Sequence, residues 1–141
     1  MKTICFFSLS LCILIFMSCQ REPDIQLRQK TTAEKIMGKW MLAKYTEECF
    51  KPISTLISSD EYNGTAGDSL IFKSNNQLYT YSDIDGNFVE DYKLLDDNTI
   101  RIEFEEWKIT RLTETEFNLV SEEIDATAGE RNTVKIALKR P

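Results

Sequence analysis

The chain has 141 residues, carries 17 lysines and arginines against 23 aspartates and glutamates, and contains no histidine. An acidic chain is a poor match for nucleic acid, which is bound through basic side chains, and it does not bind anionic lipid by charge alone. The lack of histidine removes the commonest general base and the commonest ligand of transition metals. With no recognised catalytic motif either, we expect a protein that is not an enzyme and that uses no metal and no cofactor.

Residues 1–18 have the pattern of a secretory signal peptide, because Lys2 precedes an apolar run, 4–17, that is too short to span a bilayer comfortably. The run ends at Phe16-Met17-Ser18-Cys19, which resembles a bacterial lipobox, whose cysteine becomes the lipidated first residue. We expect Cys19 to carry acyl chains such as palmitate. These would hold the protein on the outer membrane of the bacterial cell envelope, facing the periplasm or the cell surface. An ordinary cleaved signal and an uncleaved anchor are the alternatives.

Cleavage before Cys19 leaves 123 residues with 16 basic and 23 acidic side chains, a formal charge of −7. Cys49 is then the only other cysteine, so no intramolecular disulfide can form and the core alone must stabilise the fold. The length suits one domain. We expect a lipidated cysteine and tether over 19–30 and a folded domain over 31–141.

A short helix is predicted at the start of this domain. Thr31 and Glu34 have the spacing of a capping box, in which each side chain satisfies a free backbone N–H of the other residue. Gly38 favours the left-handed conformation that commonly ends a helix, so the helix can run only to Met37.

From Trp40 onward, apolar and polar residues alternate, which is typical of half-buried strands. Eight strands are predicted, at 40–47, 68–73, 77–82, 88–95, 99–104, 107–113, 117–121 and 133–139. The residues predicted to face inward are even-numbered before Glu105-Glu106 and odd-numbered after it, so we expect a tight turn there. Only the connections 48–67 and 122–132 exceed five residues. Short links between sequential strands favour an all-β fold, a small eight-stranded antiparallel up-and-down barrel with a short N-terminal helix, over a sandwich, which needs long crossovers.

Three features carry a family resemblance: Gly38-x-Trp40 after the short helix, residues 69–74 before a polar turn, and a closing hairpin formed by 107–113 and 117–120. Together they resemble the lipocalin-like lipoproteins of Bacteroides-type bacteria and, more distantly, the lipocalin and fatty-acid-binding superfamily, over about residues 31–140. The resemblance implies that Trp40 plugs the closed end of the barrel under a basic residue of the last strand, either Lys139 or Arg140. It also implies a cavity at the other end, with 48–67 as its lid.

The barrel interior has two possible states, since eight strands leave just enough room either for packed side chains or for one small ligand. The predicted inward faces carry seven aromatic residues: Trp40, Phe72, Phe88, Tyr92, Phe104, Trp107 and Phe117. Lys44 and Arg111 share the inward parity of the two tryptophans. If these side chains point inward, they lie at the open, hydrated end of the barrel or bind an anionic group of a ligand. Alternatively, a bulge turns them outward. The candidate ligand-binding residues are Trp40, Leu42, Lys44, Phe72, Tyr92, Phe104, Trp107 and Arg111.

The other polar residues are better explained by turns, solvent exposure and packing than by a metal site or a catalytic site. The segment 83–87 lacks the spacing of an EF-hand and indicates a hairpin turn around Asp85-Gly86. Five glutamates, at 103, 105, 106, 122 and 123, are expected at turns or outward positions in solvent. Cys49, with no histidine to activate it, is expected to pack as a small apolar residue.

Two functions are consistent with this pattern. The first is a membrane-anchored lipocalin-like lipoprotein that binds a small hydrophobic ligand. The alternative is a solid-core barrel that acts as a protein-interaction or accessory module and engages a partner in the cell envelope.

Overall fold

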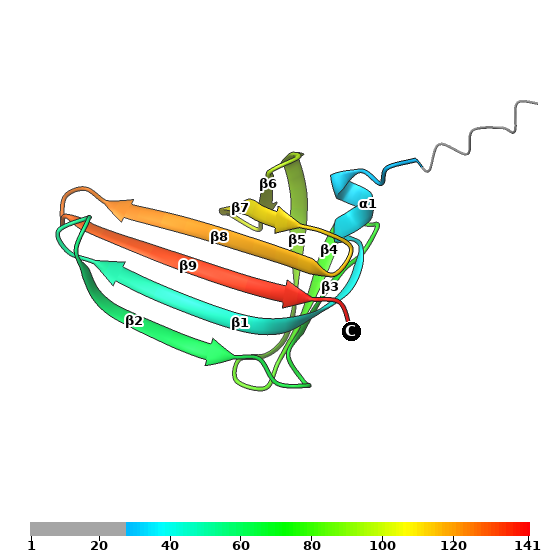
Figure 1. The fold of residues 1–141 in the computed structure, drawn as a ribbon, viewed down its shortest axis with the longest axis horizontal. Helices are drawn as coiled ribbons and strands as arrows, with labels where there is room; N and C mark the ends of the chain where they lie inside the picture. Colours follow the sequence, from blue (N-terminus) through cyan, green and yellow to red (C-terminus); the bar gives the residue numbers. More distant parts are fainter. Residues whose placement is uncertain (1–27) are drawn as a thin grey trace, which may run out of the picture.

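The computed structural model describes residues 28–141, so the predicted signal peptide, Cys19 and most of the predicted tether lie outside the described residues. Within them the chain forms one helix and nine strands (Figure 1). Their bounds are α1 (Thr32–Ile36), β1 (Gly38–Phe50), β2 (Leu56–Asn63), β3 (Ser69–Phe72), β4 (Gln77–Ser82), β5 (Gly86–Asp96), β6 (Thr99–Ile102), β7 (Glu105–Leu112), β8 (Glu116–Asp125) and β9 (Glu130–Lys139).

The capping box predicted for α1 is present. The hydroxyl of Thr31 accepts a hydrogen bond from the backbone N–H of Glu34 at 3.2 Å, and the Glu34 carboxylate accepts one from the Thr31 N–H at 2.8 Å. The helix ends at Ile36, and Gly38 has a φ of 96° as the chain turns into β1. A Cβ at Gly38 would lie 3.0 Å from the guanidinium of Arg140, so close approach also favours glycine here.

Eight strands form a closed antiparallel barrel, which confirms the predicted fold class. β3 to β9 pair in sequence order, and β1 closes the sheet because it pairs with β3 on one edge and with β9 on the other. Closure gives every barrel strand a partner on both sides, although residues 86–91 of β5 pair only with β4.

β2 is a ninth strand that the sequence did not predict, and the expectation of a long loop and lid over 48–67 is wrong. β1 continues to Phe50, and β2 pairs antiparallel with its second half, from Lys44 opposite Asn63 to Phe50 opposite Leu56. β8 and β9 likewise pair out to Asp125 and Glu130, where a long loop was expected over 122–132.

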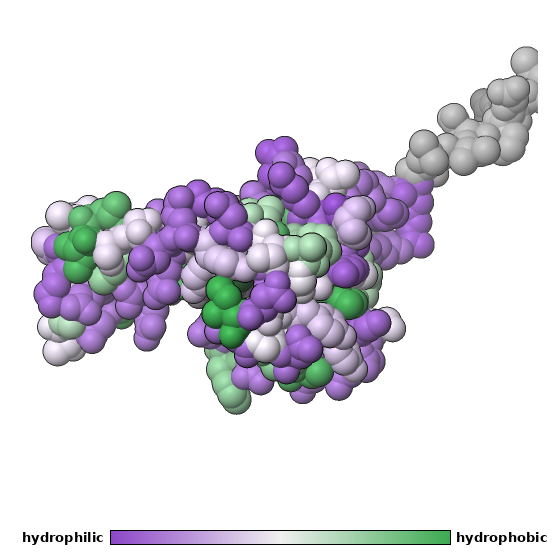
Figure 2. All heavy atoms as spheres, turned by 90° about the horizontal axis from the view of Figure 1, so that it is seen from below, coloured by the Kyte–Doolittle hydropathy of each residue, from purple (hydrophilic) through white to green (hydrophobic). Residues whose placement is uncertain are grey.

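The four strands β2, β1, β9 and β8 extend past the barrel, away from α1 (Figure 1). We refer to the extension formed by residues 48–60 and 122–133, beyond the last pairing of β8 with β7, as the arm. Figure 2 shows it as a narrow projection from a broader body, with apolar side chains at its far end. The exposed apolar residues in and beside its end turns are Ile53, Leu56, Ile57 and Ile124.

The turn predicted at Glu105-Glu106 lies two residues earlier in the chain. β6 and β7 are joined through Glu103 and Phe104, with Ile102 paired to Glu105 and a φ of 48° at Glu103. A two-residue turn between directly paired positions changes the inward parity from even to odd, which explains the phase change. It also puts Phe104 at the tip of the turn, 94% exposed, so its expected inward position is wrong.

The turn predicted over 83–87 is confirmed as the hairpin between β4 and β5, with Ser82 paired to Gly86. Cys49 lies half-buried on β1 with a free thiol.

The closed end of the barrel is filled by aromatic packing. Trp40 is fully buried and lies 5.4 Å from Phe117, ring centroid to ring centroid, and Phe72 packs at 5.6 Å from Phe117 and 5.1 Å from Tyr92. The indole N–H of Trp40 donates to the carbonyl of Ile36 at 2.7 Å. Its polar edge is therefore satisfied within α1 while the ring fills the base of the barrel.

Arg140, rather than Lys139, covers the Trp40 indole. Its guanidinium carbon lies 3.9 Å from the ring centroid, and its two terminal nitrogens donate to the carbonyls of Lys35 at 2.6 Å and Lys39 at 3.3 Å. The cation thus joins the C-terminus to α1 and to the start of β1 over the aromatic face.

Candidate functional site

The interior of the barrel is solid at the closed end and hollow at the other. A cavity of about 350 Å³ lies beyond the aromatic cluster. Its apolar wall comes from most of the barrel strands: Leu42, Leu70, Leu78, Phe88, Ile102, Trp107, Val134 and Ile136. Both states that the sequence left open therefore occur, one in each half of the barrel.

The candidate residues chosen from the sequence divide between these two halves. Leu42 and Trp107 line the cavity, whereas Trp40, Phe72 and Tyr92 are packed in the closed end and are absent from its wall. Tyr92 is fixed there by a hydrogen bond from its hydroxyl to the carbonyl of Lys73 at 2.8 Å.

Lys44 and Arg111 point outward, which is the second of the two alternatives. The register slips between Leu42 and Lys44 and between Ile109 and Arg111, so one extra residue in each strand reverses the side-chain alternation. Outside the barrel Lys44 pairs with Glu61 at 2.6 Å, and Arg111 pairs with Glu116. Neither cation reaches the cavity, so the expected basic mouth does not form.

Carboxylates take that place. Asp85, Glu90 and Glu105 line the open end of the cavity, together with the buried Asp68, and no described residue that lines it is basic. Glu90 could have been found in the sequence, since the alternation of Phe88 and Tyr92 puts it on their face. Glu105 was expected in a solvent-exposed turn. It is exposed, but the turn lies two residues earlier, so Glu105 begins β7 opposite the inward-facing Ile102 and lies at the cavity.

Hydrogen bonds to the Asp68 carboxylate connect three segments at the open end of the cavity. It is 1% exposed, and one carboxylate oxygen accepts from the Tyr62 hydroxyl at 2.6 Å and the Thr65 N–H at 2.7 Å, while the other accepts from the Asp83 N–H at 2.9 Å. These bonds connect the end of β2, the loop before β3 and the β4–β5 turn. They lower the pKa of Asp68 to about 2, the Tyr62 bond contributing most.

Glu90 and Tyr45 lie where the charged form of each side chain is disfavoured. Burial, followed by the charges of Glu103 and Glu105, raises the pKa of Glu90. Burial, followed by Glu47, Asp85 and Glu105, raises the pKa of the Tyr45 phenol, which also lines the cavity. Both shifts have the sign expected where negative charge gathers without a compensating cation.

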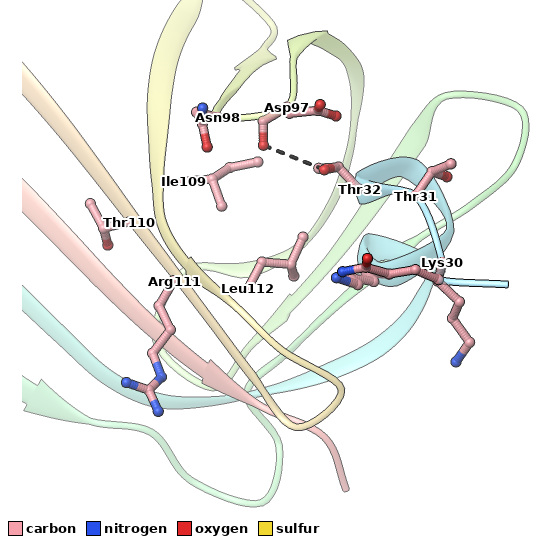
Figure 3. Close-up of a pocket in the computed structure, with 11 residues that line it drawn as sticks. Lys30, Thr31, Thr32, Asp97, Asn98, Ile109, Thr110, Arg111 and Leu112 are labelled. Atoms are coloured by element: carbon pink, nitrogen blue, oxygen red, sulfur yellow. Dashed lines mark hydrogen bonds between the residues drawn. The ribbon is translucent and has the colours of Figure 1, made fainter. Parts of the chain in front are cut away.

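A larger hollow, of about 430 Å³, lies on the outer surface of the barrel between α1, the β5–β6 turn and β7 (Figure 3). Its wall is mostly polar, and the Thr32 hydroxyl bridges it by donating to the carbonyl of Asp97 at 3.5 Å. Two of the three cations in its lining are already paired, Lys30 with Glu114 at 2.7 Å and Arg111 with Glu116; the third is Lys35. An open groove of this kind offers little apolar area, so the smaller interior cavity is the better candidate site.

Within residues 28–141, no group of three or more acidic or cysteine side chains is arranged to hold a metal ion. No helix in the same part of the chain is both long enough and apolar enough to cross a bilayer.

No family model matches the chain, and no curated protein matches it. Among solved structures, it is similar to bovine odorant-binding protein, a lipocalin. A deswapped triple mutant of that protein matches with 18% identity and a TM-score of 0.45, over 76% of this chain and 74% of that one. Its complex with a selenium-containing odorant matches with 13% identity and a TM-score of 0.45, over 80% and 74%. Likeness at this level carries no argument about function.

The chemistry of the site therefore comes from its own residues. An apolar wall removes hydrocarbon from water, and the carboxylates stand only at the open end. This arrangement suits binding of a molecule with one apolar part and one polar end.

Proposed function

We propose that the protein binds one small hydrophobic molecule in the open half of its barrel. The observation that carries this proposal is the cavity of about 350 Å³ with eight apolar side chains in its wall. Ligand sites typically measure roughly 300–1,000 Å³ and are mostly apolar with a few polar groups, and this cavity falls at the lower end of that range.

The closed end supports the same function. Because Trp40, Phe72 and Phe117 pack against one another below the cavity, they form a rigid floor that does not have to be ordered when a ligand enters. Preformed sites bind more tightly, since less conformational entropy is lost on association.

The proposal is tested by titration with the neutral fluorescent probe N-phenyl-1-naphthylamine and by native mass spectrometry of the purified protein. We expect one probe molecule per chain. Val134→Trp puts an indole into the cavity wall and should reduce the affinity at least tenfold, while Lys108→Trp, on the outer face of β7, should leave it unchanged. Equal binding by both variants, with circular dichroism showing a native fold, would overturn the proposal.

We also propose that the protein acts at a membrane of the bacterial cell envelope, held there by acyl chains on Cys19. The support is the sequence Phe16-Met17-Ser18-Cys19 at the end of a signal-like apolar run. Labelling of cells with a palmitate analogue should tag the wild-type protein and fail to tag Cys19→Ser, which should leave the membrane fraction. Recovery of unlabelled wild-type protein from the soluble fraction would contradict this location.

Engagement of an envelope protein is a second candidate, favoured by the exposed apolar residues at the end of the arm. Ile57 is 56% exposed and Ile124 57%, and Ile53 and Leu56 are exposed in the same end region. Cross-linking in intact cells should give one defined adduct that is lost in Ile57→Ser. An unchanged adduct pattern in this variant would exclude the tip of the arm as the contact.

A further inference from the structure

The charges at the mouth of the cavity all have one sign. Asp85, Glu90 and Glu105 belong to three separate segments, the β4–β5 turn, β5 and β7, and the barrel brings them to the same opening. Asp68 is also there, but its carboxylate is fully used by hydrogen bonds within the protein. Three carboxylates are thus left to face an incoming molecule.

Glu90 is the most informative of them. It lies between Phe88 and Tyr92 on the inward face of β5, directly opposite the buried Leu78 of β4. Within residues 28–141, no hydrogen bond and no ion pair joins its carboxylate to another side chain. A half-buried, unpaired carboxylate beside an apolar wall is costly for folding, so its position is more readily explained by a ligand that compensates the charge.

The cations that could have compensated it are held elsewhere. The two bulges turn Lys44 and Arg111 to the outer surface, Lys135 pairs there with Glu48 at 2.7 Å, and Arg140 covers Trp40 at the closed end. The barrel therefore separates basic groups on its outside from acidic groups at its opening.

The acidic character continues from the mouth onto the arm. A neighbouring hollow of about 400 Å³ shares Glu105 and Val134 with the cavity and is lined also by Glu47, Glu122 and Glu123. A concave surface of one sign concentrates ligands of the opposite charge and guides them inward.

We propose that the cavity selects an amphiphile with an amine-type cationic head, whose apolar body enters the barrel while the ammonium group pairs with Glu90 and Glu105. This inference rests on the proposed function of the cavity and adds the charge of its ligand. A fatty acid is disfavoured, because its carboxylate would meet three like charges and no cation.

The test compares three probes with the same tail: dodecylamine, 1-dodecanol and dodecanoate, at pH 7 and below their micellar concentrations. Each competes with N-phenyl-1-naphthylamine for the full chain. We expect dodecylamine to bind about tenfold more tightly than 1-dodecanol, since a hydrogen bond to a charged partner has about this effect on affinity. Dodecanoate should bind more weakly than the alcohol.

Glu90→Gln and Glu105→Gln should each lower the ratio of dodecylamine affinity to 1-dodecanol affinity toward one. Asp91→Asn is the matched control, because this exposed neighbour of Glu90 lies on the opposite face of β5 and loses the same charge. It should retain the preference.

The outcomes separate this inference from the function on which it rests. If the alcohol binds and the amine has no advantage, or if dodecanoate binds most tightly, the cavity binds ligands but the charge selection is wrong. If the probe binds but none of the three displaces it, the amine selection is wrong and the binding function stands. If neither the probe nor any of the three binds, both proposals fail. Equal loss of preference in Asp91→Asn would show a general effect of net charge and would overturn the assignment to Glu90 and Glu105.

Discussion

Replacement of Asp68 by asparagine is expected to destabilise the protein in a strongly pH-dependent way. The side chain is 1% exposed, and both carboxylate oxygens accept hydrogen bonds from three separate segments. Asparagine keeps one acceptor oxygen, but its amide N–H₂ group faces a donor at the other position. At least one of these bonds is therefore lost and a donor is left unsatisfied.

The magnitude follows from the pKa of Asp68, which the fold lowers from 3.8 to about 2. A shift of this size corresponds to about 2 kcal/mol of stabilisation by the ionised group. Because the pKa is lower in the folded state, the stabilisation is complete above pH 4 and is lost as the pH falls toward 2.

The assay is urea unfolding followed by tryptophan fluorescence, with wild type and Asp68→Asn compared from pH 7 to pH 2.5. We expect a difference in unfolding free energy of about 2 kcal/mol at pH 7 that shrinks steadily below pH 4. Asp91→Asn, which removes an exposed carboxylate, serves as the control and should change stability little. A difference that is absent at pH 7, or that stays constant down to pH 2.5, would refute the role assigned to Asp68.

Three further outcomes are expected. Arg140→Gln should lower the free energy of unfolding in urea by about 1–3 kcal/mol. The change removes the cation over the buried Trp40 ring and leaves two backbone carbonyls without their donor. Unchanged stability would contradict this. Lys44→Gln should leave probe and amine affinity within twofold of wild type, since the side chain lies outside the barrel; a larger loss in competition binding would show that it reaches the ligand. Affinity for dodecylamine should be full at pH 7 and should decline as the pH falls through the raised pKa of Glu90, because the carboxylate then loses its charge. Competition titrations that show tighter binding at low pH would contradict the pairing.

The sequence predicted the barrel well because alternation and hairpin links are local signals. The capping box at Thr31, the turn before Gly86 and the strands of the barrel all follow from residues a few positions apart. Trp40 at the closed end under a C-terminal cation came from the family resemblance, and packing then selected Arg140 over Lys139.

β2 could not be recognised in this way. Nearly all of its residues are exposed, so Leu56-Ile57-Ser58-Ser59 shows no alternation of buried and exposed positions. Pairing with β1 stabilises it instead, and that contact depends on how far β1 extends beyond the barrel.

The candidate site was predicted only in part, because a change of one residue in register reverses every side chain that follows. Bulges at Ala43 and Thr110 exchanged the expected cations for a carboxylate mouth, and a turn shifted by two residues moved Phe104 out and Glu105 to the cavity. Leu42 and Trp107, on the near side of their bulges, were placed correctly in the cavity wall.

The most direct test of a hollow barrel with an acidic mouth is NMR of the protein with bound dodecylamine, using intermolecular nuclear Overhauser effects to locate each end of the ligand. The structure predicts contacts from the alkyl chain to Leu70 and Trp107, and from the methylene next to the nitrogen to Glu90. Contacts confined to the tip of the arm or to the outer groove beside α1 would contradict it.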